Sequence, residues 1–158
     1  MKFVADRMLG KLAKILRILG FDVLYSNRIH FRELVRIARD EKRIILTRNS
    51  LIKTKEGEYT FFFINNNEPK RQLKEVIDGL DLKISPSNVF TRCLLCNHEL
   101  KKIEREDVEG RVPDYVFETQ RDFSLCRNCN KIFWKGTHHK NMLASFEGYL
   151  SRATETDT

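Results

Sequence analysis

The chain has 158 residues, of which 41% are hydrophobic and 32% charged, a composition typical of a soluble globular protein with one ordinary domain or two small ones. No apolar run reaches the roughly 18 residues that a membrane helix needs, which argues against a membrane protein and for a cytoplasmic location. Lysine and arginine outnumber aspartate and glutamate by 29 to 22, and the net charge of +7 favours an anionic partner such as nucleic acid.

The first predicted elements are a short buried strand from Phe3 to Ala5 and a helix that follows Asp6. Apolar residues recur at helical spacing between positions 8 and 19, and Gly20 is placed to end the helix. The opposite side of this helix is basic, which favours contact with a phosphate backbone, although a solvated face is the commoner meaning of such a stripe. Its basic residues are Arg7, Lys11, Lys14 and Arg17.

A second strand over residues 21–25 precedes a second helix, for which Ser26 and Asn27 are the expected capping residues and Glu41 the approximate end. Two successive helices with basic outer stripes predict an RNA-binding surface. To this surface we assign Arg28, Arg32 and Arg36 from the second helix, and Arg48 from the end of the next strand.

An apolar strand over residues 43–47, another over 59–64 and a helix that begins at Pro69 complete the first module. Strands and helices alternate throughout, which predicts an α/β, Rossmann-like parallel sheet over residues 1–86. A second module is expected over residues 87–142, followed by the end of a C-terminal helix and a tail over 143–158.

The four cysteines of the chain form two Cys-x-x-Cys pairs, Cys93 with Cys96 and Cys126 with Cys129. Four thiolates paired in this way hold one tetrahedral Zn²⁺, so the pattern predicts a structural zinc ribbon with no open coordination position. The span between the pairs exceeds the usual roughly 15–20 residues, which predicts an inserted hairpin or loop, with a strand from Tyr115 to Phe117. Two disulfides or one redox-active pair are the alternatives.

Ligands of an open parallel sheet bind beyond the carboxyl ends of its strands, where this sequence places Asp6 and Asn49. A metal-dependent nuclease needs several carboxylates there, because Mg²⁺ prefers hard oxygen ligands. Asp6 is the one carboxylate at these strand ends, and it also stands where a helix N-cap is expected. Glu33, one turn into the second helix, is the next candidate.

The ordered set of motifs resembles the Mut-seven C-terminal RNase domain family, which has a PIN-like fold with an attached zinc ribbon. The resemblance extends to about residue 142. It rests on Phe3 to Ala13, Leu16-Arg17, Leu19 to Asp22, Ile44 to Arg48, Gln72-Leu73, Arg92 to Asn97, Gly110 to Pro113, Tyr115 to Glu118, Cys126 to Cys129 and Trp134 to His138.

The resemblance implies metal-dependent endoribonuclease chemistry, with Asp6 as a ligand of Mg²⁺ or Mn²⁺. This chain departs from the family pattern twice. The third strand ends in Thr-Arg-Asn, with Asn49 in place of an aspartate, and the usually acidic segment before the second helix reads Ser26 to His30. An amide oxygen carries no charge, so each departure should weaken metal binding.

Two hypotheses follow. In the first, Asp6 and Glu33 hold a divalent ion, Asn49 completes or orients its shell, and an activated water attacks an RNA phosphate. In the second, the scaffold binds RNA, such as tRNA or rRNA, without cutting it. A protein-interaction adaptor is a weaker third hypothesis, because aromatic strand residues usually belong to the core. The oligomeric state and a protein partner are left open.

Overall fold

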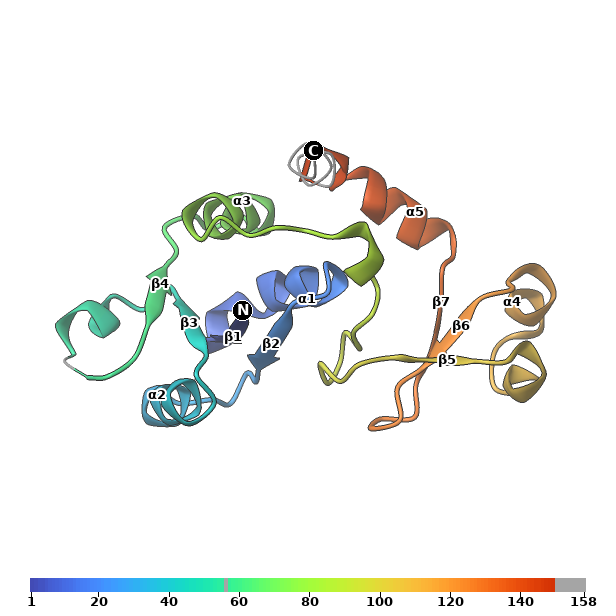
Figure 1. The fold of residues 1–158 in the computed structure, drawn as a ribbon, viewed down its shortest axis with the longest axis horizontal. Coiled ribbons are helices and arrows are strands. Elements are labelled where there is room, and N and C mark those ends of the chain that lie inside the picture. The colour runs from blue at the N-terminus through green and yellow to red at the C-terminus, as the bar shows by residue number, and fades with distance from the viewer. Residues whose placement is uncertain (56, 150–158) are drawn as a thin grey trace.

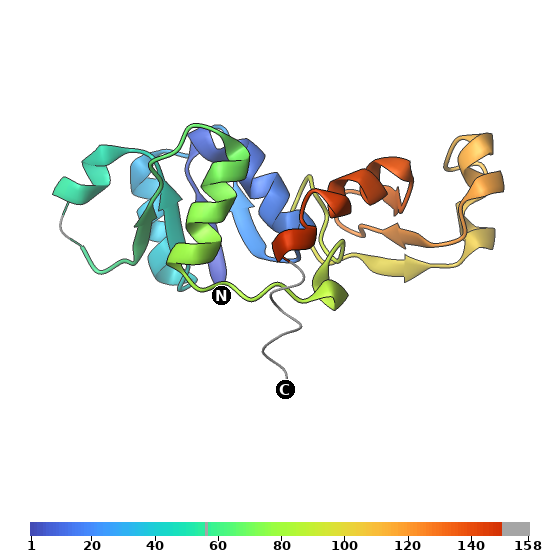
Figure 2. The same cartoon turned by 90° about the horizontal axis from the view of Figure 1, so that it is seen from above.

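The computed structural model describes residues 1–55 and 57–149. An α/β module lies at one end of an elongated molecule and a small ribbon at the other (Figures 1 and 2). None of the described helices is both long enough and apolar enough to cross a membrane.

The first module is built on a four-stranded parallel sheet of β1 (Lys2–Ala5), β2 (Asp22–Tyr25), β3 (Ile44–Thr47) and β4 (Phe61–Phe63). The strand order is β2-β1-β3-β4. The inner strands β1 and β3 are almost entirely buried, because helices cover both faces of the sheet and apolar side chains therefore suit both sides of each strand. The prediction of a parallel α/β sheet is confirmed.

The helices lie on opposite faces of this sheet (Figure 1). Helices α1 (Gly10–Ile18) and α3 (Pro69–Gly79) pack over one face, and α2 (Phe31–Asp40) packs over the other. Ser26 and Asn27 do not cap α2, because the helix begins only at Phe31 and His30 occupies its N-cap position. Because α1 and α2 lie on opposite faces, their basic stripes do not form one continuous surface.

The second module contains an antiparallel sheet of β5 (Lys101–Ile103), β6 (Phe123–Leu125) and β7 (Ile132–Trp134). The insertion between β5 and β6 carries helix α4 (Asp114–Thr119), so the prediction of a strand from Tyr115 to Phe117 is wrong. Pro113 immediately precedes this helix, where its fixed φ suits a helix start, and Asp114 adds a favourable charge to the first turn.

Helix α5 (Thr137–Ala144) leads from the ribbon back to the first module (Figure 2). Phe146, just beyond it, is buried in the same hydrophobic core as α1 and α3. The end of the chain therefore ties the two modules together. Of the predicted tail, residues 150–158 lie outside the described residues.

Candidate functional site

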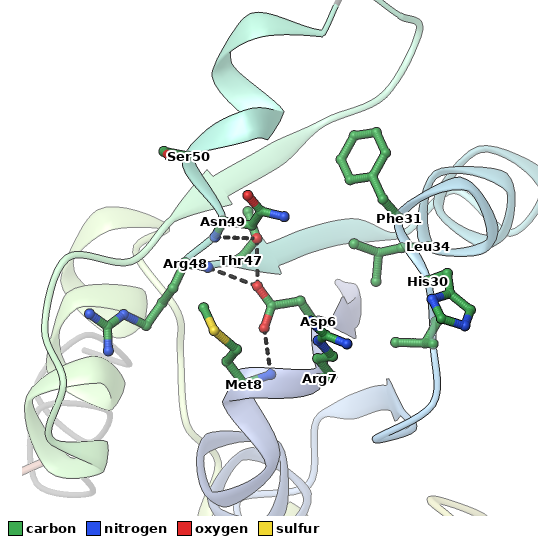
Figure 3. Close-up of a pocket in the computed structure, with 11 residues that line it drawn as sticks. Asp6, Arg7, Met8, His30, Phe31, Leu34, Thr47, Arg48, Asn49 and Ser50 are labelled. Carbon is green, nitrogen blue, oxygen red and sulfur yellow. Dashed lines mark hydrogen bonds between the residues drawn. The ribbon is translucent and has the colours of Figure 1, made fainter.

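A cavity opens where the direction of the chain through the sheet reverses. The chain passes from β1 outward to β2 and then returns across β1 to β3. In open α/β sheets, ligands bind at such a switch point, beyond the carboxyl ends of the strands. The cavity measures about 420 Å³ and is large enough for a small ligand. It is lined by Asp6, Arg7, Met8, Ile29, His30, Phe31, Leu34, Thr47, Arg48, Asn49 and Ser50 (Figure 3).

Asp6 lies at the base of this cavity, only 8% exposed, and holds β1 and β3 together. Its Oδ1 accepts a hydrogen bond from the Met8 backbone N–H (2.8 Å), so it does act as an N-cap. Its Oδ2 accepts from the Thr47 hydroxyl (2.6 Å) and from the Arg48 backbone N–H (2.9 Å). A carboxylate has roughly four positions that accept hydrogen bonds, and these bonds use three of them. About one lone pair of Asp6 remains available to a metal ion.

Two hydrogen bonds hold Asn49 in place, one from its backbone and one to its side chain. Its backbone N–H donates to the Thr47 hydroxyl (2.9 Å), and its side-chain Oδ1 accepts from the Leu51 backbone N–H (3.0 Å). The Nδ2 group has no hydrogen-bond partner among the described residues and lies at the cavity (Figure 3). Asn49 therefore presents a donor to a ligand, whereas a metal ion would need its oxygen.

The structure does not bring the three predicted catalytic residues into one metal site. Glu33 lies in the first turn of α2, is exposed, and is not among the residues that line the cavity. Asp6 is the one carboxylate of the lining. Within the described residues, only the four cysteines form a cluster of three or more His, Cys, Asp or Glu side chains close enough to share an ion. The lining also contains His30, which the sequence placed near Glu33, and Met8, Phe31 and Thr47, which were not predicted as site residues.

The predicted RNA-binding cations are distributed around the molecule. Arg7 is exposed at the cavity. The side chain of Arg48 extends away from Asp6 (Figure 3), and its guanidinium donates to the Asn65 carbonyl (3.4 Å). The other exposed cations of the predicted surface lie on α1 and at or before α2: Lys11, Lys14, Arg28, Arg32 and Arg36.

The four cysteines converge as a zinc site requires. Their sulfurs all lie within 4.8 Å of one another, with 3.6 Å between Cys93 and Cys129 and 3.3 Å between Cys96 and Cys126. A tetrahedral Zn²⁺ with Zn–S bonds of about 2.3 Å places its sulfurs about 3.8 Å apart. None of the four is in a disulfide. The arrangement fits one structural zinc ion.

The environment of the cysteines shifts their thiol pKa values in different directions. Burial raises the pKa of Cys93 to about 12 and also raises that of Cys126. Burial acts in the same direction on Cys96, but hydrogen bonds from the His98 backbone N–H and neighbouring groups outweigh it and lower the pKa to about 6. Burial thus keeps Cys93 and Cys126 neutral, and a bound cation would let all four cysteines ionise together, because metal binding releases the thiol protons.

Arg17 does not belong to the exposed basic face, and its assignment to RNA is wrong. The side chain is only 4% exposed. Its Nε donates to the Val23 carbonyl of β2 (2.9 Å), and its Nη1 donates to the carbonyls of Leu94 (2.9 Å) and Leu95 (3.3 Å), inside the first cysteine pair. Arg17 thus joins α1 and β2 to the loop of the first cysteine pair.

Asn97, which directly follows Cys96, also bonds the first cysteine pair to β2. The Val23 backbone N–H donates to its Oδ1 (3.0 Å), and its Nδ2 donates to the Asp22 carboxylate (2.7 Å). Although burial acts to raise the pKa of Asp22, hydrogen bonds from Arg43 and Asn97 lower it. Since β2 is an edge strand, Arg17 and Asn97 cover backbone groups that would otherwise be free to pair with another chain.

Arg17→Met should lower the free energy of unfolding by about 2–3 kcal/mol, because buried carbonyls lose a charged donor while methionine preserves much of the packing. The measurement is urea unfolding of the zinc-loaded protein. Lys14→Met is the matched control, since Lys14 is exposed on the same helix. Equal stability of the two variants would contradict the proposed junction.

Most of the chain is similar in sequence to one family of known proteins. Residues 1–146 match the model of the Mut7-C RNAse domain. The chain is 32% identical over 111 residues to exonuclease mut-7 of Caenorhabditis elegans, covering 63% of this chain and 12% of that protein. It is 29% identical over 111 residues to the human exonuclease mut-7 homolog, covering 66% of this chain and 13% of that protein. The matched region is thus a small part of these relatives. No solved structure matches the chain significantly.

Proposed function

Since this chain belongs to the Mut7-C RNAse domain family, we propose that it is an RNA-binding protein that holds RNA at the cavity around Asp6. In this proposal the α/β module is a PIN-like fold and the ribbon is braced by structural zinc. The observation that carries the proposal is a switch-point cavity with an exposed arginine and one carboxylate that is already hydrogen-bonded. Such a site favours RNA binding over metal-dependent cleavage, because one occupied carboxylate holds Mg²⁺ poorly.

The charge of the protein supports this choice of partner. Arg7 is exposed at the cavity, Lys11 is exposed on α1, and Arg28 and Arg32 are exposed just before and within α2. Each contact with a phosphate releases counterions, so binding should weaken steeply with salt. Structured RNAs such as tRNA or rRNA expose single-stranded loops that reach a cavity of this kind.

The test is fluorescence anisotropy with a short labelled single-stranded RNA over a range of salt concentrations, without added Mg²⁺ or Mn²⁺ so that cleavage is suppressed and bound zinc is kept. Affinity should fall with a log–log slope of about −0.7 per phosphate contacted. Arg7→Gln combined with Lys11→Gln should weaken binding and flatten the slope. The control combines Lys101→Gln and Lys102→Gln, which remove the same charge from exposed positions of the ribbon. Equal weakening by both pairs would contradict binding at the cavity.

A metal-dependent endoribonuclease is the second candidate, favoured by Asp6 at the end of β1 and by the family's name. Asn49→Asp restores a charged oxygen next to Thr47, which also contacts Asp6. We expect this variant to cleave labelled RNA in Mg²⁺ or Mn²⁺ at least about tenfold faster than the wild type, because a second carboxylate strengthens metal binding.

The double variant Asp6→Asn with Asn49→Asp is the control for this experiment, and its cleavage should return to the background level. If the wild type itself cuts RNA rapidly with Mg²⁺ and Asp6→Asn does not, the second candidate replaces the first.

A further inference from the structure

The cavity around Asp6 is polar at its base but largely apolar at its walls. At the base, Asp6 and Thr47 bond to each other and to backbone N–H groups of Met8, Arg48 and Asn49. These groups are therefore occupied within the protein. A ligand meets the apolar walls, the free donor of Asn49 and the cation of Arg7.

Two apolar side chains flank the cavity from different elements. Met8 follows β1 and is 59% exposed, which is unusual for a large hydrophobic side chain. Phe31 is the first residue of α2 and is half-buried, with its ring on the far side of Asp6 from Met8 (Figure 3). A thioether and an aromatic ring are both suited to contact the flat face of a ring system.

The polar groups around these walls suit the rest of a nucleotide. The Nδ2 of Asn49 is a donor, and its Oδ1 is already used, so it complements a carbonyl oxygen or ring nitrogen at the edge of a base. Arg7 is exposed close to Met8 and can pair with a phosphate.

We infer that the cavity receives a single unpaired nucleobase of the bound RNA, with its faces against Met8 and Phe31 and its edge against Asn49. This inference rests on the proposed function and names what that site binds. A base within a duplex is stacked on its neighbours and cannot enter, so the site selects single strands, loops or ends. The volume of about 420 Å³ accommodates one base with its ribose.

The experiment measures binding of short oligouridylate and of an abasic ribose-phosphate strand of equal length to the zinc-loaded protein at one salt concentration, without added Mg²⁺ or Mn²⁺. The wild type should prefer the strand with bases. Phe31→Leu should weaken oligouridylate binding by roughly 5- to 100-fold, the order expected when aromatic stacking on a base is lost, and Met8→Ala by roughly 2- to 10-fold, as for a lost sulfur–aromatic contact. Binding of the abasic strand should not change. Leu51→Ala is the matched control, because Leu51 is also 59% exposed but does not line the cavity.

The outcomes separate this inference from the proposed function. Equal binding of both strands by the wild type, or equal effects of Met8→Ala and Leu51→Ala, would overturn the base-binding cavity and leave phosphate-directed RNA binding in place. Binding of neither strand would overturn the proposed function itself. Because Met8 is largely exposed, Met8→Ala keeps the test valid if Phe31→Leu proves unstable.

Discussion

Withdrawal of zinc, by a chelator or by Cys126→Ser, is expected to unfold the ribbon and to lower the stability of the α/β module as well. The ribbon has a small core of its own, centred on Val108, Val116 and Phe123. Structural zinc contributes about 10–16 kcal/mol of binding free energy in small zinc peptides, which is far more than such a core can replace. The loss of stability should spread to the α/β module because the first cysteine pair contacts it. Asn97 accepts from the Val23 N–H of β2, and Arg17 of α1 is held by the Leu94 and Leu95 carbonyls.

Circular dichroism and zinc content, followed during heating, measure this effect. His98→Ala is the control, because His98 is exposed beside the first cysteine pair and should not be needed for zinc. An unchanged melting temperature after complete removal of zinc would show that the ribbon does not depend on the metal.

Asp6→Ala is expected to lower the free energy of unfolding by about 3–4 kcal/mol, independently of any catalytic role. The substitution removes an acceptor shared by Met8, Thr47 and Arg48. The Thr47 hydroxyl is buried and would lose the bond that joins β3 to the end of β1. Water that enters from the cavity can accept some of these hydrogen bonds in the variant, which limits the loss of unfolding free energy.

Urea unfolding of the zinc-loaded protein at neutral pH provides the measurement. Glu33→Ala removes an exposed carboxylate from α2 and should change stability little. If Asp6→Ala proves as stable as Glu33→Ala, the carboxylate does not hold the strands together. Asp6 would then be available for another role, such as binding a metal.

The elements that carry a strong local signal were predictable from the sequence. Buried strands such as Ile44–Thr47 appear as apolar runs, and helix α1 shows clear periodicity that ends at Gly20. The two Cys-x-x-Cys pairs predicted the second module, because this spacing is typical of the four ligands of a tetrahedral zinc site. In each case, the interaction that determines the structure lies within a few residues or within one recurring motif.

Features that depend on tertiary contacts were not predictable. Arg17 looks like its neighbour Lys14 on a helical wheel, and only the position of the zinc knuckle, about 77 residues later, buries it. Glu33 lies in the first turn of α2, as expected, but its neighbours Phe31 and Leu34 line the cavity and Glu33 does not. The apolar walls of the cavity carry no sequence signal, because Met8 and Phe31 resemble ordinary core residues.

If RNA binds at the carboxyl edge of the sheet, around Asp6, nuclear magnetic resonance can locate its contacts residue by residue. A short single-stranded RNA is titrated into the zinc-loaded, ¹⁵N-labelled protein at low salt, without added Mg²⁺ or Mn²⁺. The largest shifts should fall on the backbone amides of Met8, Phe31, Arg48 and Asn49, with little change in the ribbon insertion around α4. Shifts confined to the ribbon, or no shifts at saturating RNA, would contradict RNA binding at this edge.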